Sequence, residues 1–327
     1  MNPRPLLPLL VCAACALTLG SSLRADDTPL LKPGATVKIP GATGKFDFLE
    51  VDSVHHRLLA AHEKSGTADF IDLDTNTVLT RLEIGPAVHI VLDPKNEKYF
   101  ISDSEEKKIV IVDAKTLKVT GEIPTEGELD ALIYEPKLNR IYITHDEETH
   151  VWVVDPDAEK IVGTIEISGA PEYLVYDPAS DRIYLNLKKA NEVNVIDPAT
   201  NTIVAKWTTL PAGSPHGLAF DPATSRLFAA GGDGHLAAID IKTGKVIASI
   251  EIAKGVDQAV FDPSTRRIYC AAGATWSIAQ ETDDGLKLLG EIPANKTAKN
   301  VAIDPSNHSV WTTYTDGTDS FAQQWLP

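Results

Sequence analysis

Short apolar segments alternate with polar turns along almost the whole chain. A representative stretch holds four such segments, at residues 173–177, 182–187, 193–197 and 202–206. The first is made of aromatic and aliphatic side chains and ends at Asp177, and the connections are rich in Pro, Ala, Ser, Asp and Asn. Short segments with this pattern, bounded by turn residues, are typical of β-strands. The stretch therefore predicts four short antiparallel strands.

The turn after the first segment recurs in seven places as an acidic residue followed by Pro or Ser. We call these acidic residues the turn acids: Asp52, Asp93, Glu135, Asp177, Asp221, Asp262 and Asp304, at intervals of 41 to 44 residues. Such a side chain can accept hydrogen bonds from backbone amides two or three residues on, while Pro fixes φ at the next position. A period of about 40 residues with turn residues at constant offsets is the signature of a propeller blade. The sequence therefore predicts an all-β fold, a seven-bladed β-propeller with four antiparallel strands per blade.

The seventh unit offers only three strands, at residues 300–303, 309–314 and 320–325. Residues 35–40, which precede the first unit, have the pattern of the missing fourth strand. We expect this N-terminal strand to close the last blade, because ring closure removes exposed sheet edges. In the sixth unit Asp283-Asp284-Gly285 replaces the usual last turn, so we expect that blade to persist with an altered hairpin.

Residues 1–25 have the pattern of a secretory signal peptide. A basic start at Arg4 is followed by a mostly apolar run and by Ala25, a small residue, at the end. A transmembrane anchor is the competing interpretation, but the run is short and contains Pro8. We therefore predict a signal peptide over residues 1–25, a single propeller domain over 26–327, a periplasmic or secreted location, and no membrane insertion after cleavage.

Removal of the signal peptide changes both the charge and the cysteine content. The 30 basic residues become 28, against 46 acidic ones, so the net charge moves from −16 to −18. An acidic chain without clustered Lys and Arg disfavours nucleic acid and anionic membranes as partners. Cys270 is then the only cysteine, and its strand-like surroundings predict a buried, unreactive thiol. We expect a monomer.

The repeated units resemble the YVTN-repeat β-propeller family, in particular its exported YncE-like members, over essentially all of residues 35–327. The resemblance is carried by three stretches of turn and strand, at residues 196–200 (IDPAT), 217–222 (GLAFDP) and 255–263 (GVDQAVFDP). It implies a seven-bladed propeller in the cell envelope or secreted. It implies no reaction, because the family's motifs mark blade construction.

One end of the central channel is the place where a site is expected. Two sets of loops converge there, so residues from distant blades can meet without a local motif. The position five residues before each turn acid holds Asp47, Val88, Asp130, Glu172, His216, Asp257 and Lys299. The next position holds His89 and Tyr173 in two of the blades, and a nearby loop adds His62. The candidate ligand-binding residues are Asp47, His62, His89, Asp130, Glu172, Tyr173, His216, Asp257 and Lys299.

Two explanations of these residues stay open. The carboxylates recur in four blades, so they can simply cap backbone amides where strands begin. Together with the histidines they can instead hold a ligand or a divalent cation, since carboxylates supply hard oxygen and imidazoles neutral nitrogen. No closely spaced metal motif supports the cation, and the cofactor is left unknown.

The chain lacks the motifs of the commonest reactions. It has no Gly-x-Ser-x-Gly elbow, no phosphate-binding Gly-Lys-Ser/Thr loop and no Cys-x-x-Cys-His haem site. The first hypothesis is therefore a non-catalytic binding or interaction propeller that holds a protein, a peptide or a cation. The alternative is a propeller-type lactonase, hydrolase or lyase, in which His89 or His216 works with Asp130 or Glu172. A surface-layer or assembly module is a third.

Overall fold

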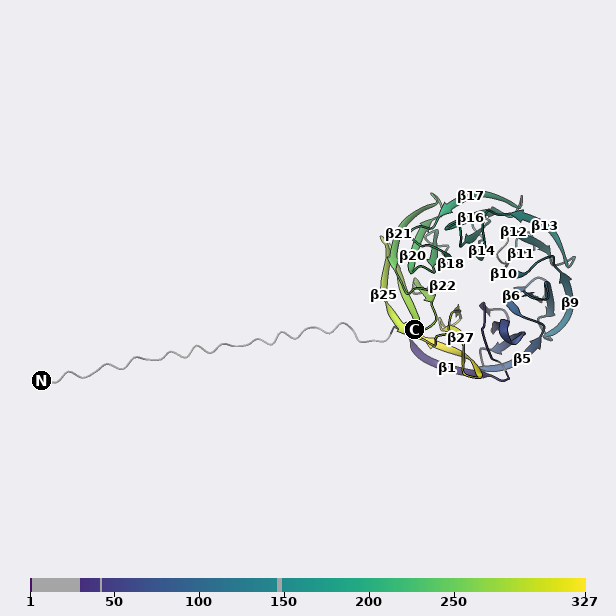
Figure 1. Ribbon diagram of the computed structural model, residues 1–327, viewed down its shortest axis with the longest axis horizontal. Coiled ribbons are helices and arrows are strands. Elements are labelled where there is room, and N and C mark those ends of the chain that lie inside the picture. The colour runs from purple at the N-terminus through teal and green to yellow at the C-terminus, as the bar shows by residue number, and fades with distance from the viewer. Residues whose placement is uncertain (2–29, 42, 146–148) are drawn as a thin grey trace.

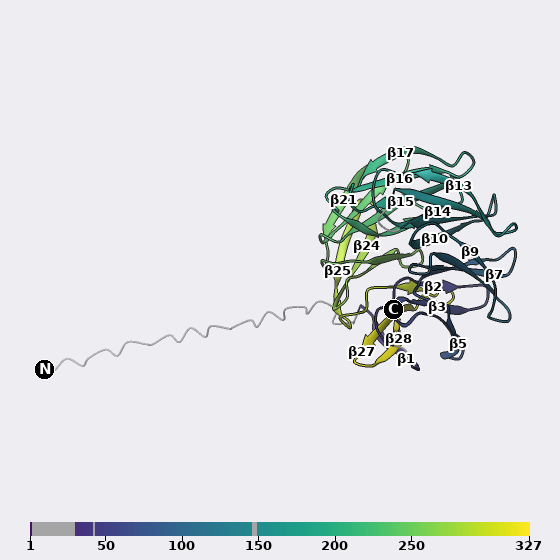
Figure 2. The ribbon, with the colours of Figure 1, turned by 45° about the vertical axis from the view of Figure 1, so that its right-hand side comes forward.

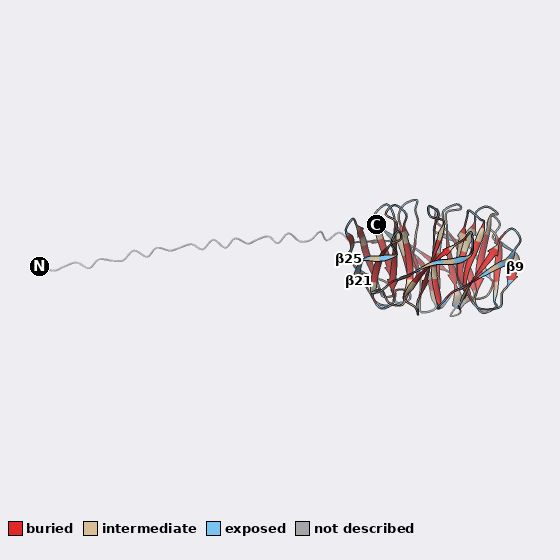
Figure 3. Cartoon of the chain, turned by 90° about the horizontal axis from the view of Figure 1, so that it is seen from above, coloured by how far each residue is buried: buried red, intermediate tan, exposed pale blue. Residues whose placement is uncertain are grey.

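Seven four-stranded antiparallel sheets form a ring around a central channel (Figure 1). The structure is a computed structural model and describes residue 1 and residues 30–41, 43–145 and 149–327. Seen from the side, the ring is a disc with loops on both faces and buried strands between them (Figure 3). The predicted seven-bladed β-propeller is confirmed.

Each blade runs from an innermost strand at the channel to an outermost strand at the rim. The innermost strands are β2 (Leu49–Asp52), β6 (Ala87–Asp93), β10 (Leu129–Glu135), β14 (Pro171–Asp177), β18 (Pro215–Asp221), β22 (Gln258–Asp262) and β26 (Ala302–Ile303). The second strands are β3 (Arg57–His62), β7 (Lys98–Asp103), β11 (Arg140–His145), β15 (Arg182–Leu187), β19 (Arg226–Gly231), β23 (Arg267–Ala271) and β27 (Val310–Asp316). The third strands are β4 (Thr67–Asp72), β8 (Lys108–Asp113), β12 (His150–Asp155), β16 (Glu192–Asp197), β20 (His235–Asp240), β24 (Thr275–Thr282) and β28 (Asp319–Leu326). The outermost strands are β5 (Thr77–Glu83), β9 (Lys118–Pro124), β13 (Lys160–Glu166), β17 (Thr202–Thr208), β21 (Lys245–Glu251), β25 (Gly285–Pro293) and, for the last blade, β1 (Lys32–Ile39).

The turn acids build the first turn of every blade in the predicted way. Asp93 Oδ1 accepts hydrogen bonds from the amides of Lys95, at 3.0 Å, and Asn96, at 3.3 Å. Glu135 does the same with both carboxylate oxygens, at 2.6 and 2.9 Å. All seven turn acids are buried. Water is excluded there, so the hydrogen bonds from the turn amides to these carboxylates hold the turn in place.

The second and third strands of each blade are buried because neighbouring sheets pack face to face. Between the second and third blades, for example, Phe100 and Ile111 belong to the same apolar cluster as Ile143 and Trp152. The outermost strand β17 alternates between exposed and half-buried positions, since only one of its faces meets a neighbour. Cys270 is fully buried, and burial raises the pKa of its thiol to about 12. The predicted burial of this cysteine is confirmed, and its lack of reactivity stays a prediction.

The N-terminal strand closes the ring. Strand β1 pairs antiparallel with β28, so the last blade combines both ends of the described propeller (Figures 1 and 2). The strand begins at Lys32, three residues earlier than expected, and ends at Ile39. In the sixth blade β24 and β25 pair as far as Thr282 and Gly285, which gives the altered hairpin expected there.

The predicted signal peptide and the question of a membrane-spanning helix remain. Residues 2–25 of the predicted signal peptide lie outside the described residues. Within the part of the chain that is described, no helix has the length and apolarity that a membrane crossing requires.

Candidate functional site

The central channel contains two separate cavities. We call the first the polar funnel; its volume is about 470 Å³ and it is lined by the ring of residues five positions before the turn acids, namely Asp47, Val88, Asp130, Glu172, His216, Asp257 and Lys299. We call the second the lower cavity; its volume is about 590 Å³ and it is lined by the ring one position before the turn acids, namely Val51, Leu92, Tyr134, Tyr176, Phe220, Phe261 and Ile303. The sevenfold spacing therefore places equivalent residues of the seven blades around each cavity.

The polar funnel is mainly acidic. Its carboxylates are Asp47, Glu63, Glu105, Glu128, Asp130, Glu172 and Asp257, and its lysines are Lys45, Lys188 and Lys299. Negative charge gathered in a concave site attracts cations, because the low-dielectric walls focus the field. The funnel therefore favours a positively charged occupant.

Asp47 is the most perturbed acid of the funnel. Lys45 Nζ lies 2.8 Å from Asp47 Oδ2 and 2.8 Å from Glu63 Oε2. Burial raises the pKa of Asp47 to about 7, although Lys45 opposes the shift and the charge of Asp257 adds to it. The side chain is nevertheless 20% exposed, because it faces the funnel. Its charge therefore changes close to neutral pH.

Glu172 and His216 meet on the opposite side of the funnel. Glu172 forms an ion pair with Lys188, and its Oε1 lies 4.0 Å from His216 Nε2. Burial raises the pKa of Glu172, an effect that His216 and Lys188 oppose. His216 Nδ1 donates to the carbonyl oxygen of Ser214 at 2.8 Å, so this nitrogen carries a proton and Nε2 is directed to the carboxylate.

Three acids of the funnel ring, Asp47, Glu172 and Asp257, are paired with lysines. Asp257 Oδ2 lies 4.0 Å from Lys299 Nζ, which repeats the pairing seen for Asp47 and Glu172. Among the described residues, no group of three or more His, Cys, Asp or Glu side chains is arranged to hold a metal ion. Their described partners are ammonium groups, so the capping of backbone amides at strand entries does not explain these three acids.

His89 and Tyr173 lie below the funnel, in a partition between the two cavities. The ring of Phe48 stacks on His89 with centroids 4.7 Å apart and on Tyr173 with centroids 5.4 Å apart. Phe48 lines the polar funnel, whereas His89 and Tyr173 line the lower cavity. The partition of Phe48, His89 and Tyr173 therefore separates an acidic compartment from a largely apolar one.

His89 also joins neighbouring blades. Its Nδ1 accepts a hydrogen bond from the backbone amide of Leu132 in the next blade, at 2.9 Å. Gln258, at the equivalent position of the sixth blade, accepts one from the amide of Val301 at 3.0 Å. The two side chains differ in type but make the same contact, so the structure gives His89 a clear role in holding blades together.

His62 is not at the channel mouth. Its ring is fully buried, stacks on Phe46 with centroids 3.6 Å apart, and contacts Asp69 Oδ2 at 3.1 Å through Nδ1. The loop after β3 folds back in the η1 turn (Glu63–Ser65), and Glu63 from that turn lines the funnel in place of the histidine. Of the nine predicted residues, six therefore line the polar funnel, two line the lower cavity and one lines neither.

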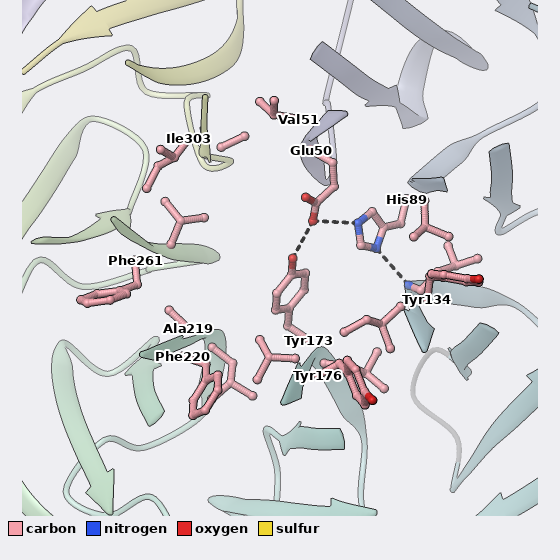
Figure 4. Close-up of a pocket in the computed structure, with 18 of the residues that line it drawn as sticks. Glu50, Val51, His89, Tyr134, Tyr173, Tyr176, Ala219, Phe220, Phe261 and Ile303 are labelled. Atoms are coloured by element: carbon pink, nitrogen blue, oxygen red, sulfur yellow. Dashed lines mark hydrogen bonds and ion pairs between the residues drawn. The ribbon is translucent and has the colours of Figure 1, made fainter. Parts of the chain in front are cut away.

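The sequence analysis missed several charged residues of the two cavities, among them Lys45, Lys188 and Glu50. Lys45 and Lys188 each form an ion pair with a funnel acid. No sequence motif marks either lysine, and only its position in a loop beside the channel could have indicated it. Glu50 lies in the lower cavity, where its Oε1 accepts a hydrogen bond from Tyr173 Oη at 2.6 Å (Figure 4). A comparison of the blades two positions before each turn acid would have found Glu50, because it is the only charged residue there.

Comparisons with known proteins establish the fold. No family model matches the chain, and no curated protein sequence matches it. A chain of a solved structure described as "Crystal Structure of Mitotic Checkpoint Complex" superposes with a TM-score of 0.79 and 14% identity, over 100% of this chain and 99% of its own length. A chain of hydrazine synthase from Kuenenia stuttgartiensis superposes with a TM-score of 0.74 and 13% identity, over 87% of this chain and 98% of its own. These likenesses show the fold alone, a β-propeller, and the finer resemblance to the YVTN-repeat family stays a prediction.

Proposed function

We propose that this protein is an exported, non-catalytic binding propeller whose polar funnel holds basic side chains of a peptide or protein partner. The observation that carries the proposal is the composition of the funnel, in which seven carboxylates face three lysines and one histidine. Lysine or arginine side chains of a partner would neutralise the remaining negative charge. A funnel of about 470 Å³ has the size of sites that take a few side chains.

A peptide explains the funnel better than a metal ion does. A metal needs several ligands converging on one point at short distances. Asp47, Glu172 and Asp257 instead come from three separate blades, and each is paired with a lysine on the funnel wall. Distributed charge of this kind suits several ammonium or guanidinium groups on one chain. The solved neighbour described as a checkpoint complex is itself part of an assembly, so the fold is compatible with interaction.

Export belongs to the same proposal. The signal-peptide pattern of residues 1–25 supports it, and a mature chain with a single, buried cysteine is compatible with it. In an oxidising compartment such a chain needs no disulfide and offers no accessible thiol.

The test measures binding of a fluorescein-labelled hexalysine peptide to the chain from residue 26 onwards. We expect binding that weakens with added salt, no binding of a hexaglutamate peptide, and affinity lowered about tenfold in Glu172→Gln or Asp257→Asn. Glu251→Gln is the matched control, because Glu251 is exposed on the rim strand β21, away from the funnel. Equal binding of the basic and the acidic peptide would overturn the proposal.

One observation favours an enzyme as the second candidate. The Nδ1 proton of His216 is donated to a carbonyl, so Nε2 is the nitrogen that is able to accept a proton as a general base, and it lies 4.0 Å from Glu172. A catalytic pair of His89 with Asp130 or Glu172 has less support. Both ring nitrogens of His89 already form hydrogen bonds, one to Glu50 and one to the amide of Leu132. A panel of lactones and esters, assayed with wild type and His216→Ala, tests this: turnover lost in the variant supports catalysis, and no turnover by wild type removes it.

A further inference from the structure

Glu50 is the exception in an otherwise apolar ring. Two positions before the turn acids the other six blades carry Val91, Ile133, Val175, Ala219, Val260 and Ala302. All seven of these positions line the lower cavity. A carboxylate facing apolar walls costs free energy unless it is hydrogen-bonded or paired with a charge. Its presence in one blade alone therefore calls for a specific reason.

The hydrogen bonds of Glu50 come from two neutral donors. Tyr173 Oη donates to Glu50 Oε1 at 2.6 Å, and burial followed by the charge of Glu50 raises the pKa of Tyr173 well above its ordinary value, so the hydroxyl keeps its proton. His89 Nδ1 accepts from the amide of Leu132, which leaves the ring proton on Nε2 to be donated to Glu50 Oε1 at 3.2 Å. Figure 4 shows both contacts in the middle of the cavity.

The negative charge of Glu50 is therefore positioned but not neutralised. Both described hydrogen bonds use Oε1, and within the described residues no Lys or Arg forms an ion pair with this carboxylate. The side chain is 35% exposed, and it is exposed to the cavity that it lines. A cation that enters the cavity would find an oriented carboxylate oxygen in low-dielectric surroundings, where charge interactions are strong.

The wall below Glu50 is aromatic over four consecutive blades. Tyr134, Tyr176, Phe220 and Phe261 line it. The hydroxyls of the two tyrosines are bonded to turn residues, Tyr134 Oη to Asn139 Oδ1 at 2.9 Å and Tyr176 Oη to Asp181 Oδ1 at 3.1 Å. The faces of such rings attract cations, and their bodies bury apolar groups. The turn residues Pro178 and Pro222 also line the cavity, so it reaches the turn face of the disc.

We propose that the lower cavity binds an organic amine with an apolar body, whose ammonium group pairs with Glu50 while the body packs on the aromatic wall. The cavity volume of about 590 Å³ lies within the range of small-molecule sites. This site is distinct from the polar funnel, because the partition of Phe48, His89 and Tyr173 lies between them. Its ligand is a small monocation, whereas the funnel proposal concerns a basic peptide.

The test compares three probes of similar size by isothermal titration calorimetry: 2-phenylethylamine, the neutral 2-phenylethanol and the anionic phenylacetate. We expect the amine to bind and the other two to bind at least about tenfold more weakly. Glu50→Gln is the decisive variant, since its amide oxygen can still accept from Tyr173 and His89 while the charge is gone. We expect it to keep the wild-type unfolding temperature and to lose at least about tenfold in affinity for the amine.

Two further variants separate this site from the funnel and from a purely structural role. Glu172→Gln should leave amine binding unchanged, because Glu172 lines only the funnel. Ala219→Phe should abolish amine binding by filling the lower cavity, with hexalysine binding unchanged. Equal binding of the amine and the alcohol, no binding of the amine, or unchanged amine affinity in Glu50→Gln would each overturn the proposal, and none of these outcomes touches the funnel.

Discussion

His56 Nε2 lies 3.0 Å from Asp304 Oδ2, across the seam where the first blade meets the last. The other ring nitrogen, Nδ1, lies 2.7 Å from Asp74 Oδ1. Both contacts require the nitrogen to donate to a carboxylate, so the cationic form of the ring is favoured. The hydrogen bond to Asp304 raises the pKa of His56 above its ordinary value of 6.5; burial opposes the shift and Asp74 adds to it.

This pairing predicts a seam whose stability depends on pH. A pKa raised on folding gives stabilisation that is complete below the unfolded value of 6.5 and is lost as the pH rises through the folded value. His56→Gln should therefore destabilise the protein most in mildly acidic buffer, and the difference from wild type should shrink in mildly alkaline buffer. Urea unfolding across this range measures the effect; a difference independent of pH would contradict it.

Closure by β1 predicts a large effect of one buried isoleucine. Ile39 is fully buried in a cluster that includes Trp311 and Ala322, whereas Ile247, on the rim strand β21, is 44% exposed. We expect Ile39→Ala to lower the free energy of unfolding by about 2–5 kcal/mol. The matched substitution Ile247→Ala should change it by less than about 0.5 kcal/mol. Similar effects of the two substitutions in chemical denaturation would show that ring closure contributes little.

The cysteines predict both a protected thiol and a way to detect signal cleavage. Cys270 is buried and its thiol pKa is raised to about 12 by burial, so it should not react with Ellman's reagent in the native protein. After denaturation the exported chain should show one thiol per molecule, because cleavage removes Cys12 and Cys15. A count of three would mean that the N-terminal segment is retained.

Asp47 predicts how binding in the polar funnel responds to pH. Its pKa is raised to about 7 by burial, so it loses its negative charge as the pH falls through neutrality. The affinity for hexalysine should therefore decrease between about pH 8 and pH 6. Asp47→Asn should remove most of that decrease, because the variant is uncharged throughout. A slope that is the same in both proteins would assign the titration to another group.

The fold was readable from the sequence because it is repeated. Each turn acid marks the same position in its blade. Once Asp52 and Asp93 are recognised as equivalent, the innermost strand of each blade is located, and so is the residue five positions earlier that lines the funnel. The strand that closes the ring was predictable for the same reason, since the seventh unit lacked a partner for β28.

The roles of single side chains were less readable. His89 was considered a candidate because histidine occurs once at its position, yet Gln258 makes the same contact between blades. The sequence shows the type of a residue, whereas the hydrogen bond depends on which atom reaches the neighbouring amide. The ion pair of Lys188 with Glu172 was unpredictable for the same reason, because only the folded loops bring the two side chains together.

The partition of Phe48, His89 and Tyr173 gives the disc a separate cavity at each end of the channel. The stacked rings lie between the two cavities, so a ligand in one cavity occupies a different space from a ligand in the other. Ligands on the two faces therefore do not compete for space. Under the two proposals above, the protein would hold a basic peptide at one end and a small amine at the other at the same time.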